Sequence, residues 1–176
     1  DNEAYMNTGI QRSGSTPEYA ATSTTPVGSL WKGKPQRRKN MLMIMAAHRI
    51  PYIASASLAY IPDFKRKIQK AAEITRNGEG MAYLQVHQPC TTGWYFDPAK
   101  TVEIGRLAVQ TGAYPIAEID HGEFKLNIKP RELKPMKEYL EPQRRFRHVD
   151  EELLEIIQGH VTEDWESYLK LDEQGK

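Results

Sequence analysis

The chain opens with a polar stretch of nine residues that reads Asp1-Asn2-Glu3-Ala4-Tyr5-Met6-Asn7-Thr8-Gly9. A run rich in Gly, Ser, Thr and Pro follows it, through residue 17. Such a segment cannot bury itself as regular structure, so we expect a loop. Its carboxylate, amide and carbonyl oxygens are the ligands that a hard cation prefers. Its glycine lets the backbone approach a phosphate group closely. The stretch therefore predicts a loop that binds a cation and a phosphate group.

Helix and strand patterns alternate after residue 40, which favours an α/β fold with a parallel sheet. Asn40 is a candidate cap for a helix over residues 41–48, and the apolar segment 51–57 predicts a buried strand. Further along we expect a helix over 63–75, a strand over 81–86, and a helix over 98–111 that Gly112 ends in left-handed backbone. Segments 116–120 and 124–128 predict a hairpin at the edge of the sheet.

The two ends of the chain differ from this middle region. Residues 1–40 are interrupted by Pro17, Pro26 and Pro35 and predict a long irregular segment, which is usually functional when it occurs inside a domain. Three further prolines punctuate a charged arm after residue 128. Residues 149–171 predict one or two amphipathic helices whose apolar stripe needs a surface to pack on. We therefore divide the chain into a domain over 1–128 and a helical C-terminal arm over 129–176.

Composition narrows the class of protein. Of the 176 residues, 24 are Lys or Arg and 23 are Asp or Glu, so the net charge indicates no nucleic-acid partner. No apolar run approaches the ~20 residues that a membrane span needs. A single cysteine excludes an internal disulfide framework and fits a cytoplasmic location. The chain does not begin with Met, and its first residues already belong to a predicted site, so we expect a C-terminal piece of a longer polypeptide.

One short segment is more basic than the rest and has two interpretations. It contains Lys32, Lys34, Arg37, Arg38 and Lys39. The segment is either a solvated face of a linker or a docking patch for an acidic partner. The five histidines are scattered without the spacing of a metal pair, and the sequence contains no nucleophile elbow, Walker loop or dinucleotide fingerprint.

Three more blocks accompany the opening stretch in a recognisable order. They read Ala46-Ala47-His48-Arg49-Ile50-Pro51-Tyr52-Ile53-Ala54, then Pro89-Cys90-Thr91-Thr92-Gly93-Trp94, then Thr101-Val102-Glu103-Ile104-Gly105-Arg106-Leu107-Ala108-Val109. In order and approximate spacing, residues 1–147 resemble the β subunits of pyruvate:ferredoxin oxidoreductase and its 2-oxoacid relatives. The resemblance implies that residues 1–128 are the C-terminal portion of a thiamine diphosphate-binding fold, a parallel sheet flanked by helices.

The resemblance also assigns roles to the opening loop. It implies that the Asn2 side chain and the Ala4 backbone carbonyl bind the Mg²⁺ of thiamine diphosphate, and that Tyr5, Thr8 and Gly9 contact the cofactor. Asn7 resembles the amide that faces the thiazolium ring and the substrate, where it can stabilise developing negative charge. The Gly-Asp-Gly motif that supplies a further metal ligand in this family is absent from the sequence.

Cys90 is the second assignment that the resemblance makes. It follows the strand expected over 81–86, at the carboxyl end where ligands sit in open α/β sheets. By resemblance it is one of four thiolates that hold a four-iron four-sulfur cluster near the thiamine, and the other three cysteines are absent from this sequence. The alternative is a buried, inert cysteine.

The resemblance implies oxidative decarboxylation of pyruvate with coenzyme A, with electrons passing through the cluster to ferredoxin, as part of a complex with α-, γ- and δ-type subunits. Two alternatives stay open. The same chemistry could act on branched-chain 2-oxoacids such as 2-oxoisovalerate, or on oxalate. The chain could instead be a noncatalytic assembly module with vestigial cofactor half-sites.

Overall fold

A four-stranded mixed sheet organises the computed structural model, which describes residues 1–174. Its strands are β1 (Tyr52–Ser57), β2 (Ala82–His87), β3 (Ala117–Asp120) and β4 (Glu123–Leu126), in the spatial order β2-β1-β3-β4. The first two strands run parallel, with Ala54 opposite Leu84. β3 and β4 form the expected antiparallel hairpin, which joins the sheet beside β1 and leaves β4 at its edge. The predicted α/β class is confirmed, and the hairpin makes the sheet mixed.

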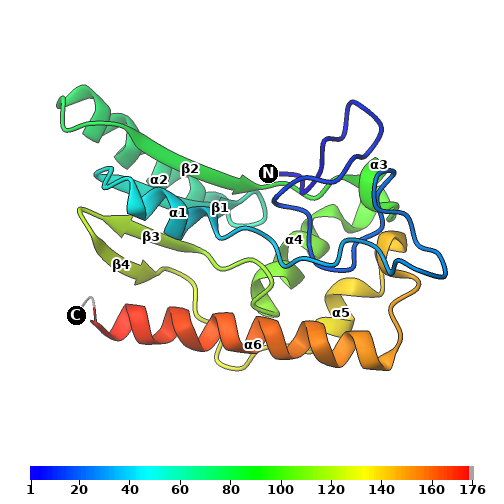
Figure 1. The fold of residues 1–176 in the computed structure, drawn as a ribbon. Helices are drawn as coiled ribbons and strands as arrows, with labels where there is room; N and C mark the ends of the chain where they lie inside the picture. Colours follow the sequence, from blue (N-terminus) through cyan, green and yellow to red (C-terminus); the bar gives the residue numbers. More distant parts are fainter. Residues whose placement is uncertain (175–176) are drawn as a thin grey trace.

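Helices cover both faces of this sheet (Figure 1). α1 (Met41–Ala47) and α6 (Glu151–Gln174) pack on one face, and α2 (Ile61–Arg76) packs on the other. The other helices are α3 (Thr91–Trp94), η1 (Pro98–Lys100), α4 (Thr101–Gln110), α5 (Met136–Leu140) and η2 (Arg144–Phe146). Successive strand residues point to opposite faces, and β1 shows this directly. Tyr52 and Ala54 pack against α2, whereas Ile53 packs in the cluster that contains residues of α1, the hairpin and α6.

The largest apolar cluster lies beyond the carboxyl ends of β1 and β2. It joins buried residues of α3, α4, α5 and η2 with Ile157 of α6. Gly105 lets α4 approach closely, because a Cβ atom there would lie 2.9 Å from the Cβ of Ala59. This cluster fixes the short helix α3 and the turn before it in place.

Most of the expected local structure is present. The Asn40 side chain accepts a hydrogen bond from the backbone N–H of Met43 at 3.2 Å and caps α1. Gly112 follows α4 with φ of +79°, as a left-handed helix end requires. The C-terminal helix is single rather than double, and its Trp165 and Tyr168 pack on the hairpin face of the sheet. No helix within residues 1–174 is both long and apolar enough to cross a membrane.

Residues 1–40 contain no helix or regular strand, as expected, and are held by three isolated bridges. The basic segment inside this region is only partly open to solvent. Lys34 is buried, and its ammonium group donates hydrogen bonds to the backbone carbonyls of Thr16 and Arg37 at 2.6 and 3.1 Å. Arg37 pairs with Glu163 and Asp164 of α6 at 2.7 and 2.5 Å. Lys32 and Lys39 stay exposed, so a solvated face and a docking patch both remain possible for that part of the segment.

Candidate active site

Hydrogen bonds fix the first residues to the carboxyl end of β2. The backbone carbonyl of Asp1 accepts from the N–H of Gln88 at 2.9 Å. Its carboxylate accepts from the Gln85 amide at 2.6 Å, from the Arg38 guanidinium at 3.2 Å, and from the N–H of Glu3 at 2.9 Å. The opening stretch thus begins at the sheet edge where parallel strands present their ligand sites.

The loop then projects away from the sheet and folds back on itself (Figure 1). Tyr5 and Gln11 exchange two backbone hydrogen bonds of 2.9 and 3.1 Å. Between them, Asn7, Thr8 and Gly9 are exposed, and Gly9 has a φ of +101° that favours glycine. The predicted cofactor contacts therefore sit together on an accessible loop, as a binding role requires.

The two predicted Mg²⁺ ligands flank Glu3. Asn2 and Ala4 are half-buried. The backbone carbonyl of Asn2 accepts from the Trp94 indole N–H at 2.9 Å. Across residues 1–174, neither the Asn2 side-chain amide nor the Ala4 carbonyl takes part in a hydrogen bond. Both oxygens are thus uncommitted, and oxygen is the donor type that Mg²⁺ prefers. The free oxygens of Asn2 and Ala4 therefore fit the role of Mg²⁺ ligands.

Cys90 lies in a tight turn directly after β2. It caps α3, and its sulfur accepts a hydrogen bond from the backbone N–H of Gly93 at 3.4 Å. The thiol is half-buried and forms no disulfide. The described part of the chain holds no group of three or more Cys, His, Asp or Glu side chains that could bind a metal ion. Cys90 fits the role of one thiolate ligand, and a complete cluster would need further ligands from elsewhere.

The structure brings the opening loop and the Cys90 turn together, although 81 or more positions separate them in the sequence. Besides the bond from Trp94 to Asn2, the Met6 side chain lies directly over Gly93. A Cβ atom added at Gly93 would lie 2.2 Å from the Met6 sulfur and 3.4 Å from the Cys90 sulfur. The segments that carry the predicted cofactor contacts and the predicted cluster ligand therefore form one continuous surface.

Sequence reasoning missed a buried ion cluster beneath this surface. Glu3 is only 1% exposed, and its carboxylate lies 2.5 Å from Arg145, 3.3 Å from Arg38 and 3.5 Å from the His87 ring. Burial opposes ionisation of Glu3, but the adjacent Arg145, His87 and Arg38 outweigh it and hold its pKa below the usual range. Burial lowers the pKa of His87 in turn, so this histidine is neutral at pH 7.

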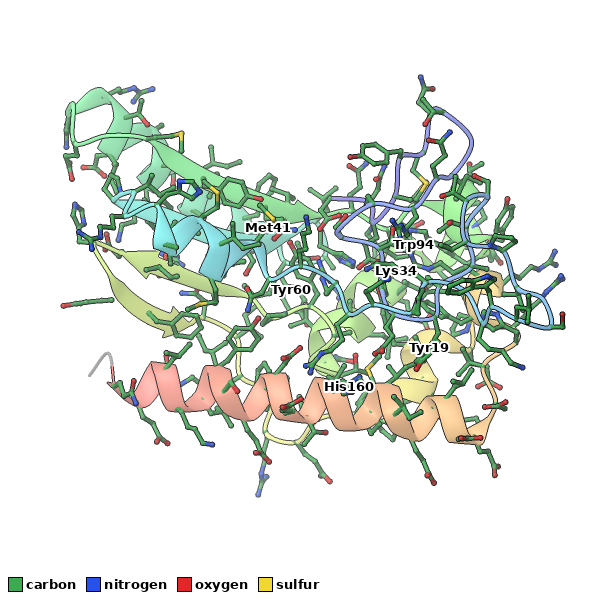
Figure 2. All side chains as sticks on the ribbon, viewed as in Figure 1. Tyr19, Lys34, Met41, Tyr60, Trp94 and His160 are labelled. Carbon is green, nitrogen blue, oxygen red and sulfur yellow. The ribbon has the colours of Figure 1, made fainter. Side chains whose placement is uncertain are left out.

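Aromatic rings surround the same cluster. The Arg145 guanidinium lies 3.9 Å from the centre of the Trp94 ring, and Arg38 lies 4.9 Å from the centre of the Tyr114 ring. His87 packs against both rings. Figure 2 shows Trp94 and Lys34 within this densely packed end of the molecule. No sequence pattern marks Arg145, which is 142 positions from Glu3.

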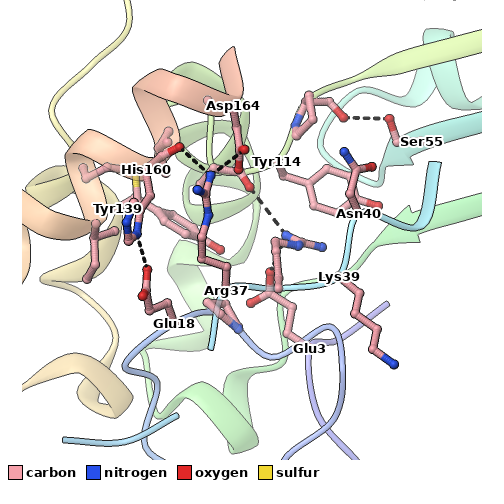
Figure 3. A pocket seen from close by; sticks show the side chains of 18 of the residues that line it. Glu3, Glu18, Arg37, Lys39, Asn40, Ser55, Tyr114, Tyr139, His160 and Asp164 are labelled. Atoms are coloured by element: carbon pink, nitrogen blue, oxygen red, sulfur yellow. Dashed lines mark hydrogen bonds and ion pairs between the residues drawn. The ribbon is translucent and has the colours of Figure 1, made fainter. Parts of the chain in front are cut away.

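A mostly apolar cavity of about 110 Å³ lies between α6 and the segment before α1 (Figure 3). Two ion pairs lie at its wall, Glu18 with His160 and Arg37 with Asp164. Its lining includes none of Asn2, Ala4, Asn7 or Cys90. A second hollow is lined by Gly9 together with the exposed Arg144 and Arg147, which place positive charge beside the loop. The predicted site therefore belongs to the loop surface and not to the inner cavity.

The chain belongs to the 2-oxoacid:ferredoxin oxidoreductase family. It is 55% identical over 163 residues to pyruvate synthase subunit PorB of Methanocaldococcus jannaschii, which covers 93% of this chain and 53% of that protein. It is 46% identical over 175 residues to ketoisovalerate oxidoreductase subunit VorB of Pyrococcus furiosus, covering 98% of this chain and 55% of the relative. The chain thus spans about half the length of the curated relatives it matches.

Among solved structures, a similar chain comes from the 2-oxoglutarate:ferredoxin oxidoreductase of Magnetococcus marinus with 2-oxoglutarate, coenzyme A and succinyl-CoA bound. It shares 29% identity and a TM-score of 0.47, over 58% of this chain and 31% of that one. No protein-family model matches the chain.

Proposed function

We propose that this chain is the part of a β-type subunit that contributes the metal loop and one cluster ligand to a 2-oxoacid:ferredoxin oxidoreductase. The implied reaction converts pyruvate, coenzyme A and oxidised ferredoxin into acetyl-CoA, carbon dioxide and reduced ferredoxin, and it is reversible. The observation that carries the proposal is the contact between the opening loop and the Cys90 turn, in a chain 55% identical to a pyruvate synthase subunit. We place the enzyme in the cytoplasm, in a complex with α-, γ- and δ-type subunits.

The residues of the opening loop would divide metal binding, cofactor contact and substrate contact among them. The Asn2 side-chain oxygen and the Ala4 carbonyl would hold the Mg²⁺ that anchors the diphosphate, while Tyr5, Thr8 and Gly9 would line the cofactor. When bound, thiamine diphosphate supplies a nucleophilic carbon and an electron sink for decarboxylation. The exposed amide of Asn7 can donate a hydrogen bond to the substrate carboxylate or to a developing enolate oxygen.

Cys90 would bind the cluster that carries electrons away from the cofactor. As one of four thiolates of a four-iron four-sulfur cluster, it would place that cluster beside the loop that holds the cofactor. The hydrogen bond from the Gly93 N–H to its sulfur stabilises negative charge on that atom, and such bonds are one of the means by which a protein sets a cluster potential. Glu3, Arg145 and the rings around them keep the region beneath the loop packed.

Two alternative functions differ in what they predict for the intact complex. Action on 2-oxoisovalerate is favoured by the 46% identity to a ketoisovalerate oxidoreductase subunit, and oxalate is a further substrate of the same class. The remaining alternative is a noncatalytic assembly module. The complete complex, purified without oxygen, should lose visible iron–sulfur absorption when pyruvate and coenzyme A are added. Loss of this absorption only with 2-oxoisovalerate or oxalate would reassign the substrate. A complex that contains neither cofactor nor cluster would favour the noncatalytic assembly module.

A single substitution tests the role of Cys90 in that complex. We expect Cys90→Ala to lower the iron content by one four-iron cluster while the fold is kept, because alanine fills the same half-buried turn without a thiolate. Iron content is measured against Thr92→Ala, a substitution in the same turn that removes no sulfur. An unchanged iron count in Cys90→Ala would remove this residue from the cluster.

A further inference from the structure

The backbone of Glu3 adopts a conformation that its side chain does not favour. Its φ is +65°, in the left-handed region where residues other than glycine are uncommon. Such a conformation persists only where surrounding contacts over-determine it. Here it lies between Asn2 and Ala4, the two residues whose oxygens are uncommitted and which the proposed function assigns to Mg²⁺. The bend at Glu3 therefore decides how those two oxygens are placed relative to each other.

Three separate segments bond to Glu3 and hold this bend. The Thr16 hydroxyl donates to the Glu3 carbonyl at 2.6 Å. The carboxylate is held by Arg145 of η2 at 2.5 Å and by Arg38 at 3.3 Å, and the His87 ring at the end of β2 packs 3.5 Å from it. An exposed glutamate in a loop would need none of these partners. Their convergence on a side chain that is 1% exposed indicates that the position of residue 3 is specified closely.

Arg145 also connects the bend to the cysteine turn. Its ε N–H donates to the Gln143 side chain at 2.9 Å, which fixes the guanidinium plane. That plane lies 3.9 Å from the centre of the Trp94 ring, and the Trp94 indole N–H donates to the carbonyl of Asn2. Asn2 is thus held from both sides, through the backbone of Glu3 and through the ring that Arg145 supports.

We propose that Glu3 and Arg145 form a positioning pair, which sets the Asn2 and Ala4 oxygens for a divalent cation and ties that geometry to the turn of Cys90. Neither residue touches the cation or the substrate in this scheme, and both act through their neighbours. The inference rests on the proposed function, because it takes the cation loop as its target. Residues that orient metal ligands from behind change metal affinity by about 10- to 100-fold when they are substituted.

The experiment measures Mg²⁺ affinity in the complete complex, stripped of metal and titrated at a fixed thiamine diphosphate concentration with bound cofactor as the readout. We expect Glu3→Gln to raise the Mg²⁺ dissociation constant about tenfold or more. Glu3→Asp keeps the negative charge but cannot reach Arg145 from the same backbone, so it should lose affinity as well. Asn2→Ala is the positive control, because it removes a proposed ligand directly.

Glu118→Gln is the matched control. Glu118 is also a buried carboxylate paired with an arginine, at 3.0 Å from Arg66, but it lies between the sheet and α2. It should lose thermal stability like the Glu3 variants and keep a Mg²⁺ affinity within about twofold of wild type, since distant sites act independently. This comparison separates placement of the metal ligands from general loss of stability.

Each outcome decides between the possibilities. Loss of affinity in both Glu3 variants supports the positioning pair. Loss in Glu3→Gln with wild-type affinity in Glu3→Asp would overturn it, because charge alone would then explain the effect, and wild-type affinity in both would overturn it outright. If the Glu3 variants do not assemble, Arg145→Lys carries the same test, and wild-type affinity there would overturn the pairing. A wild-type complex that binds neither Mg²⁺ nor thiamine diphosphate would instead refute the proposed function.

Discussion

The contact between Met6 and Gly93 predicts that Gly93→Ala destabilises the wild-type protein but stabilises a Met6→Ala variant. An added Cβ at Gly93 would lie 2.2 Å from the Met6 sulfur and 2.6 Å from its terminal methyl carbon. The Met6 side chain must therefore leave its place over α3 in a Gly93→Ala variant. Because Met6 is flexible and only half-buried, we place the cost of this rearrangement near the middle of the range for overpacking, about 2 kcal/mol.

Helix propensity acts in the opposite direction. Gly93 is inside the single-turn helix α3, where alanine is favoured over glycine by about 0.5–1 kcal/mol. The net effect of Gly93→Ala should be a loss of about 1 kcal/mol, which corresponds to a melting temperature lower by about 2–4 °C. In a Met6→Ala background the clash is gone and only the helix gain remains. The same substitution should then stabilise by about 0.5 kcal/mol.

The assay is thermal unfolding of the complete subunit, followed by circular dichroism, for the wild type, both single variants and the double variant. Gly159→Ala is the matched control, because a Cβ at this exposed position of α6 would meet nothing within 4 Å. It should stabilise in either background. An equal loss from Gly93→Ala in both backgrounds would refute the contact between the loop and the cysteine turn.

Two further predictions concern ion pairs away from the loop. Burial opposes ionisation of Glu118, but bonds from Arg66, Tyr52 and Asn127 outweigh it and lower its pKa to about 2. Its stabilisation is therefore present above the usual glutamate pKa of 4.5 and lost as the pH falls toward 2. In urea unfolding, the difference in unfolding free energy between wild type and Glu118→Gln should narrow from about pH 5 to about pH 3. A difference that stays constant would contradict the lowered pKa of Glu118. Arg37→Met should cost about 1 kcal/mol at low salt and less at high salt, because its acidic partners on α6 are exposed; a salt-independent loss in thermal unfolding would contradict this.

Local sequence signals determine most of the elements. The Asn40 cap, the left-handed Gly112 and the alternation of β1 residues between faces each depend on neighbours within a few positions, so they can be derived from the sequence. The hairpin is equally local, since two short strands flank a tight turn. The family resemblance rests on the opening loop and the Cys90 turn, and the relatives confirm it.

Contacts between distant segments could not be derived in this way. The basic run shows strong charge but no signal that Lys34 turns inward to two backbone carbonyls. Likewise, Glu3 meets Arg145 only because η2 folds back beside Trp94, and nothing in the local pattern of residue 145 shows this. A lysine or glutamate is most often exposed, so the sequence pattern assigns such residues to the surface. Only the fold shows which of them find buried partners.

The metal ligands can be located by anomalous diffraction from crystals of the complete complex, grown with thiamine diphosphate and with Mn²⁺ in place of Mg²⁺. We expect one strong manganese peak at about 2.1–2.3 Å from both the Asn2 side-chain oxygen and the Ala4 carbonyl oxygen, with diphosphate oxygens among its other ligands. A manganese peak held by other oxygens, while Asn2 and Ala4 point away from it, would show that these two residues do not bind the metal.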